Sequence, residues 1–125
     1  MKKAKTIWIT LIVLIVIGGG VYLLAREAKK PGVYDTLAQC ITDSGAKFYG
    51  AWWCPHCQAQ KAMFGKSGKK LPYIECQTQS RQLTDECIAA DIEGYPTWIF
   101  ADGTRQTGEH TIEALAEKTN CELPQ

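Results

Sequence analysis

An uncharged apolar run near the amino terminus constrains this chain more than any other feature. Residues 7–24 read IWITLIVLIVIGGGVYLL, a stretch of 18 residues without a charge. At a helical rise of about 1.5 Å per residue this run would cover ~27 Å, enough to cross the hydrocarbon core of a bilayer. The alternative is a cleaved signal peptide, whose apolar region is usually ~7–15 residues long, and residues 25–28 (AREA) keep that alternative open. We expect an uncleaved signal-anchor.

The cysteines, more than the flanking charges, indicate which way the anchor is expected to face. Three basic residues precede the run and three follow it, so the positive-inside rule gives little help. Six cysteines in 125 residues indicate a compartment in which disulfides persist. We therefore expect a cytoplasmic amino terminus (1–6), a transmembrane anchor (7–24), a linker (25–33) and an extracytoplasmic domain (34–125). The net charge of +1 argues against nucleic acid as a partner.

The remainder of the chain alternates between helix and strand signals. The expected helices cover 34–44, a segment from Pro55 to Gly65, 83–92 and a segment that Thr111 caps; the expected strands cover 46–53, 71–76, 97–101 and 104–107. In the second helix we expect an inward face made of Ala59, Ala62 and Met63. The order α-β-α-β-α-β-β-α predicts an α/β fold with a mixed sheet and helices on both faces.

Two cysteines stand two residues apart where the first strand is expected to meet the second helix, in Cys54-Pro55-His56-Cys57. A structural zinc site usually needs two such pairs, and the other cysteines form no second CxxC. A c-type haem anchor needs histidine after the second cysteine, where this chain has Gln58. We expect no metal or organic cofactor. A purely structural disulfide remains open.

The position of the pair favours redox chemistry over a structural role. Pro55 suits the first turn of a helix, which places Cys54 at the helix amino terminus. Unpaired N–H groups and the helix dipole stabilise a thiolate there, and the thiolate is the form that attacks disulfides. Between the cysteines, His56 can add positive charge or a hydrogen-bond donor, and we interpret Pro55 and His56 as redox-tuning residues.

Several motifs together resemble the thioredoxin fold across nearly all of residues 34–120: a strand, WCPHC, a helix and then GYPTW before a hairpin. The resemblance implies that Cys54 is an exposed nucleophile and that Cys57 resolves the mixed disulfide. It also implies that Tyr95 offers its backbone to a substrate strand beside a cis Pro96.

The stretches FYGAWWCPHCQAQKAMFG, YIEC and GYPTW are more closely similar to the thioredoxin-like domains fused to, or partnered with, vitamin K epoxide reductase homologues. This resemblance implies protein thiols and disulfides as substrates, and a quinone-linked membrane oxidoreductase of the vitamin K epoxide reductase or DsbB type as partner. It implies a location in the periplasm or the thylakoid lumen. Cys-Pro-His-Cys is also the active-site sequence of the DsbA oxidants.

The chain departs from thioredoxin itself in two places. Phe48 stands where thioredoxin has a buried aspartate, and the nearest acidic candidate by sequence is Glu75. The first strand of thioredoxin is also missing, since the domain opens with a helix. Both departures leave oxidation or isomerisation more open than reduction.

The other four cysteines allow three pairings. The related domains have a comparable extra pair, so the resemblance favours Cys76–Cys87 and leaves Cys40 and Cys121 for the second bridge. A second redox relay at Cys76 and Cys87 is the rival interpretation. Three tryptophans, Trp52, Trp53 and Trp98, are expected either in the core or on an apolar platform around Cys54, and we count Trp53 with Tyr95 and Pro96 as substrate-binding.

The sequence thus predicts a membrane-anchored, extracytoplasmic thiol–disulfide oxidoreductase. The competing hypothesis is a binding or assembly module that keeps the fold without turnover.

Overall fold

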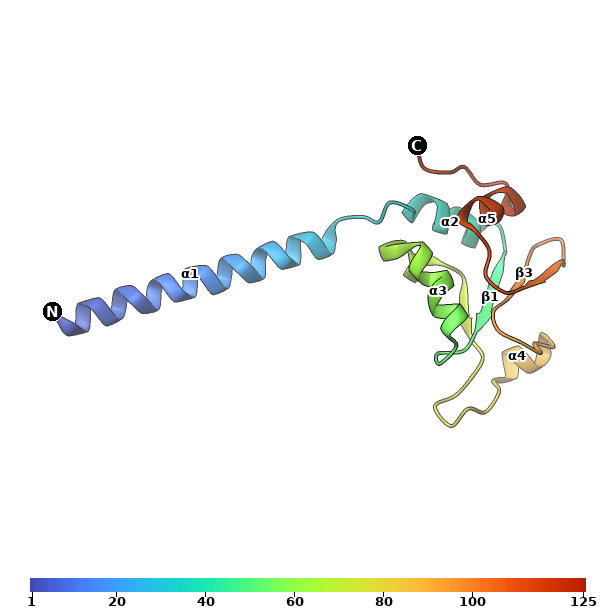
Figure 1. Ribbon diagram of the computed structural model, residues 1–125, viewed down its shortest axis with the longest axis horizontal. Helices are drawn as coiled ribbons and strands as arrows, with labels where there is room; N and C mark the ends of the chain where they lie inside the picture. The colour runs from blue at the N-terminus through green and yellow to red at the C-terminus, as the bar shows by residue number, and fades with distance from the viewer. The chain divides into compact units, whose positions relative to one another are not determined.

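A computed structural model describes residues 1–125, except for the side chain of Lys2, and it divides into two units, Met1–Lys30 and Pro31–Gln125. The first unit consists of helix α1 (Lys2–Lys29), drawn in blue in Figure 1. Its apolar part has a mean hydropathy of 2.6 and contains no buried residue. By length and composition the helix could cross a membrane, as a signal sequence also could.

Helix α1 continues through most of the segment that we expected to be a linker, 25–33, because it ends only at Lys29. The residues AREAK at 25–29 are all strong helix formers, so nothing in them breaks the helix. Pro31 disfavours helical geometry at the residue before it, and Lys30 is extended, with ψ at 132°.

The second unit is built on one four-stranded mixed sheet with the strand order β2-β1-β3-β4. Its strands are β1 (Lys47–Gly50), β2 (Tyr73–Glu75), β3 (Thr97–Ile99) and β4 (Arg105–Thr107). Strand β1 pairs in parallel with β2 and antiparallel with β3, and β3 pairs antiparallel with β4. The predicted α/β class with a mixed sheet is confirmed.

Five helical segments accompany the sheet: α2 (Asp35–Asp43), α3 (Pro55–Met63), the 3₁₀ helix η1 (Gly65–Lys70), α4 (Asp85–Ala89) and α5 (Ile112–Thr119). Pro55 occupies the first turn of α3, and the Thr111 hydroxyl caps α5 by accepting the Ala114 N–H at 3.2 Å. Elements therefore follow one another along the domain in the predicted order.

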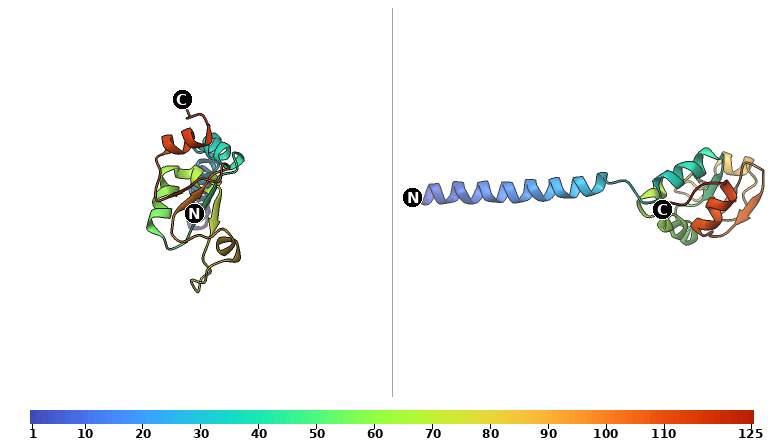
Figure 2. Two further views of the ribbon diagram at one scale, coloured as in Figure 1. Left: turned by 90° about the vertical axis from the view of Figure 1, so that its right-hand side faces the viewer. Right: turned by 90° about the horizontal axis from the view of Figure 1, so that it is seen from above.

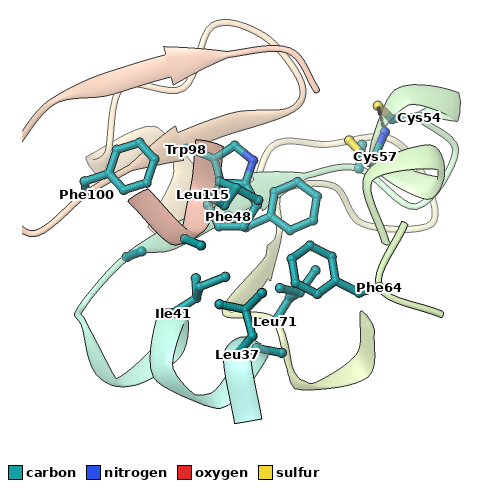
Figure 3. Packing of buried hydrophobic residues seen from close by; sticks show 14 residues of the cluster. Leu37, Ile41, Phe48, Cys54, Cys57, Phe64, Leu71, Trp98, Phe100 and Leu115 are labelled. Carbon is teal, nitrogen blue, oxygen red and sulfur yellow. Dashed lines mark hydrogen bonds between the residues drawn. The ribbon is translucent and has the colours of Figure 1, made fainter. Parts of the chain in front are cut away.

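Neighbouring residues of β1 point to opposite faces of the sheet, and each face has its own core. On one face Phe48 stacks on Trp98 at 4.6 Å between ring centroids and packs with residues of α2, α3 and α5, as Figure 3 shows. On the other face Tyr49 packs with Cys76, Cys87 and Ile92 around α4, which Figure 2 (left) shows well apart from α2 and α5. Helices thus lie on both faces, as predicted.

Some element boundaries and one helix face differ from the prediction. Strand β1 ends at Gly50, and Trp52 and Trp53 form a turn, because the chain must reverse before Cys54 can begin a helix. The expected helix 83–92 shortens to Asp85–Ala89. The inward face of α3 carries Cys57 and Gln60 instead of the predicted alanines and methionine.

Candidate functional site

Cys54 and Cys57 lie at the start of α3, just after the turn that follows β1. Cys54 is the N-cap residue of α3 in an extended conformation, and its Sγ accepts the backbone N–H of Cys57 at 3.1 Å. This bond satisfies one of the N–H groups that the first turn of a helix leaves without a partner. Both sulfurs appear at the amino-terminal end of α3 in Figure 3, and they are not bridged to each other. The pair therefore stands as two thiols that one helix turn holds close together.

Neither thiol is freely exposed. The relative exposure of Cys54 is 3 % and that of Cys57 is 0 %. Burial of the second cysteine is what a resolving residue needs, but the resemblance implied an exposed first cysteine. Cys54 is covered because its sulfur turns inward onto the Cys57 N–H and joins the hydrophobic core.

Burial favours the protonated form of the Cys57 thiol. Loss of solvation, followed by the hydrogen bond with Cys54, raises the pKa of Cys57 from 9.0 to about 12. Its Sγ lies against Gly50, where an added Cβ would stand 2.9 Å from the sulfur and 2.7 Å from Cε2 of Tyr73. Only glycine at position 50 leaves room for this sulfur beside the Tyr73 ring.

The raised pKa predicts a dependence of stability on pH. In a Cys54→Ser variant, which keeps the Cys57 thiol, the free energy of unfolding is expected to fall as pH rises above about 9. There the unfolded chain releases the Cys57 proton while the folded domain retains it, so the unfolded state is favoured. Urea unfolding below and above this pH measures the slope. Adding Cys57→Ala should make the slope shallower, and what remains belongs to Tyr73, whose pKa burial also raises; an equal slope in both variants contradicts the assignment.

The structure shows the surroundings of Phe48, at the position of the thioredoxin aspartate, and of Glu75, the nearest acidic candidate by sequence. Phe48 is fully buried in the core and carries no acid. Glu75 is held nearby, accepting the N–H of Trp52 at 3.2 Å, the N–H of Gln77 at 3.0 Å and the hydroxyl of Tyr73 at 2.8 Å. Its carboxylate thus reaches the surroundings of Cys57 through Tyr73, and the ammonium of Lys61 lies 3.2 Å from the centroid of the same ring.

His56 has a partner that the sequence gave no reason to expect. Its Nδ1 lies 2.6 Å from Oε1 of Glu109, which belongs to the loop between β4 and α5. The two residues are 53 positions apart, and neither lies in a periodic pattern that predicts contact. Glu109 was therefore not predictable as a site residue from the sequence.

The cis-proline loop lies beside the aromatic turn that precedes Cys54. The Tyr95–Pro96 peptide bond is cis, and the rings of Tyr95 and Trp53 meet edge to face at 6.1 Å between centroids. Gln77 joins them, since its side chain accepts the indole N–H of Trp53 at 2.6 Å and contacts the Tyr95 hydroxyl at 3.4 Å. The structure therefore brings together the residues that we predicted to bind substrate, and Gln77 lies in contact with two of them.

The three tryptophans divide between the two predicted roles. Trp98 is fully buried in the core, whereas the relative exposures of Trp52 and Trp53 are 47 % and 40 %. An apolar platform beside Cys54 would thus consist of Trp52 and Trp53 without Trp98.

The remaining cysteines form two disulfides. Cys40 in α2 is bonded to Cys121, which follows α5, and Cys76, which directly follows β2, is bonded to Cys87 in α4. Cys76 and Cys87 have no exposed surface, so a partner thiol has no direct access to them. Among residues whose side chains the structure describes, no cluster of His, Cys, Asp and Glu could hold a metal ion.

Comparison with known proteins gives two informative relatives and no matching protein-family model. Over 94 residues, or 71 % of its length, the chain is 43 % identical to Thiol-disulfide oxidoreductase LTO1 of Arabidopsis thaliana. Over 59 residues it is 37 % identical to Protein disulfide isomerase-like 1-4 of the same plant, a match to 46 % of the chain. The chain spans 25 % of the first relative and 10 % of the second.

Proposed function

Because these similarities support membership of a thioredoxin-like family, we propose that this chain is a protein thiol–disulfide oxidoreductase acting through Cys54 and Cys57. The observation that carries the proposal is the position of the pair: two unbridged thiols at the start of α3, with the cis Pro96 loop close by through Tyr95 and Trp53. Pro55 and His56 tune the pair, and Tyr95, Pro96 and Trp53 receive the substrate chain.

Substrate oxidation takes two exchange steps. A partner thiolate attacks Sγ of Cys54 in the Cys54–Cys57 disulfide, the S–S bond breaks, and Cys57 leaves and takes up a proton. A second partner thiolate then attacks the partner sulfur of the mixed disulfide and releases Cys54. Two electrons have passed from the partner to this chain, and reduction of a partner disulfide is the same sequence reversed.

The proposal includes the cellular location of the domain and the enzyme that reoxidises it. Helix α1 anchors the chain, residues 1–6 remain in the cytoplasm, and the domain acts in the periplasm or the thylakoid lumen. A quinone-linked membrane enzyme of the vitamin K epoxide reductase or DsbB type reoxidises Cys54 and Cys57. The apolar character of α1 and the two disulfides support this setting.

One observation favours a second candidate, a binding module without turnover: Cys54 is almost fully covered while the neighbouring Trp52 and Trp53 are exposed. Assays of the full chain in detergent separate the candidates, using oxidation of reduced ribonuclease and reduction of insulin. Turnover in either assay supports the oxidoreductase, and the faster direction shows which way electrons flow. A chain that binds unfolded protein but is inert in both assays is a binding module.

A further inference from the structure

His56 contacts Glu109 on a loop that a buried side chain of α3 holds in place. Both residues lie at the surface, with 30 % of the Glu109 side chain and 70 % of the His56 side chain exposed. The loop that carries Glu109 is fixed independently of His56, because the backbone of the next residue is hydrogen-bonded to α3.

Gln60 is the residue that fixes this loop. Its side chain is completely buried on α3, its Nε2 donates to the carbonyl of His110 at 2.9 Å, and its Oε1 accepts the His110 N–H at 2.8 Å. One amide therefore pairs with both backbone groups of the residue that follows Glu109. Gln60 also stands four residues after His56, on the same side of α3. We call Gln60 and the His110 backbone the Gln60 clamp.

From this arrangement we infer that Glu109 is a positioning residue, held by the Gln60 clamp, that weakens the oxidising power of Cys54 and Cys57 by engaging His56. The inference rests on the proposed function and deepens it. Protonated His56 can stabilise the thiolate of Cys54 in the reduced pair, which favours the dithiol and makes the disulfide a stronger oxidant. Glu109 competes with that thiolate for the imidazolium.

The direction of the expected shift in the dithiol–disulfide equilibrium depends on which redox state is stabilised by each partner of His56. Glu109 stabilises the imidazolium equally when Cys54 and Cys57 are bonded and when they are reduced, so it adds nothing to the reduced state. Without Glu109, the thiolate itself becomes the partner of the imidazolium, and that attraction exists only in the reduced state. Removing the carboxylate should therefore shift the equilibrium toward the reduced protein.

The test is the glutathione equilibrium of the full chain in detergent, quenched with acid, alkylated and quantified by mass spectrometry on the peptide that carries Cys54 and Cys57. For Glu109→Gln we expect the equilibrium constant for reduction to rise about two- to fivefold, the range that an exposed ion pair can supply. In a His56→Ala background the same substitution should have no effect. Glu117→Gln, which removes an equal charge from the exposed face of α5, should leave the constant unchanged.

The possible results separate this inference from the proposed function. An unchanged constant, a shift toward the disulfide, or a shift that persists without His56 overturns the inference alone, provided that the wild-type pair equilibrates with glutathione. A pair that forms no disulfide in any glutathione buffer overturns both.

Discussion

Replacing Cys54 with serine is expected to lower the rate of disulfide exchange with protein substrates on the order of 10³-fold or more, close to the rate without protein. Exchange requires a sulfur that can form the mixed disulfide, and a serine hydroxyl forms none. Cys57 cannot take over this role, because it has no exposed surface and burial raises its pKa to about 12. The variant is assayed by ribonuclease oxidation and insulin reduction.

The same variant should fold normally, which makes the loss interpretable. Serine is among the preferred N-cap residues, and its hydroxyl can accept the Cys57 N–H that Sγ of Cys54 now accepts. We expect the free energy of unfolding to change by no more than about 1 kcal/mol. A folded Cys54→Ser chain that keeps substantial exchange activity would place the reactive sulfur elsewhere.

Removing the Cys40–Cys121 disulfide with a double serine variant is expected to lower the free energy of unfolding by about 4.5 kcal/mol. The bridge joins residues 81 positions apart, so it restricts almost the whole unfolded domain, and it ties α2 to the segment after α5. The entropy that cross-linking removes from the unfolded chain grows with loop length. Urea unfolding followed by tryptophan fluorescence measures the loss.

The second disulfide provides a matched control. Cys76 and Cys87 are only 11 positions apart, and the same reasoning gives about 3 kcal/mol for their removal. The expected ranking is therefore a larger loss for the longer loop. The reverse ranking would show that local packing around α4, and not the length of the loop, governs the effect of these bridges.

The order of the elements was predictable because each carries its own local signal. The apolar spacing of Leu37, Ala38 and Ile41 fits one buried helix face, and these residues are the buried face of α2. Pro55 and Thr111 mark helix starts through chemistry confined to one turn, and both do so in the structure. The mixed sheet then follows from the alternation of such elements.

The interior of α3 was not predictable from the same rules. Apolar residues were assumed to face inward, whereas the buried face includes Gln60. A buried amide is stable there only because both of its polar atoms pair with the His110 backbone, 50 residues away. The partner of His56 is hidden for the same reason, since polar contacts between distant segments leave no periodic trace in the sequence.

The solvent exposure of Trp52, Trp53 and Cys54 was also not predictable from the sequence. Trp52 and Trp53 continue an apolar run that predicts a strand, but the capping of α3 by Cys54 requires a turn before it. The turn exposes both indoles, and it directs the sulfur of Cys54 toward the Cys57 N–H. The sulfur is therefore nearly buried although the indoles beside it are exposed.

A trapping experiment with Cys57→Ser tests the central claim most directly, because it asks whether a partner sulfur reaches Cys54. The full chain in detergent is incubated with an oxidised protein substrate, alkylated, digested and analysed by mass spectrometry for cross-linked peptides. We predict a stable mixed disulfide that carries Cys54, absent from a Cys54→Ser, Cys57→Ser variant. If the folded Cys57→Ser chain forms no such adduct, or forms it through another cysteine, Cys54 is not the exchanging sulfur.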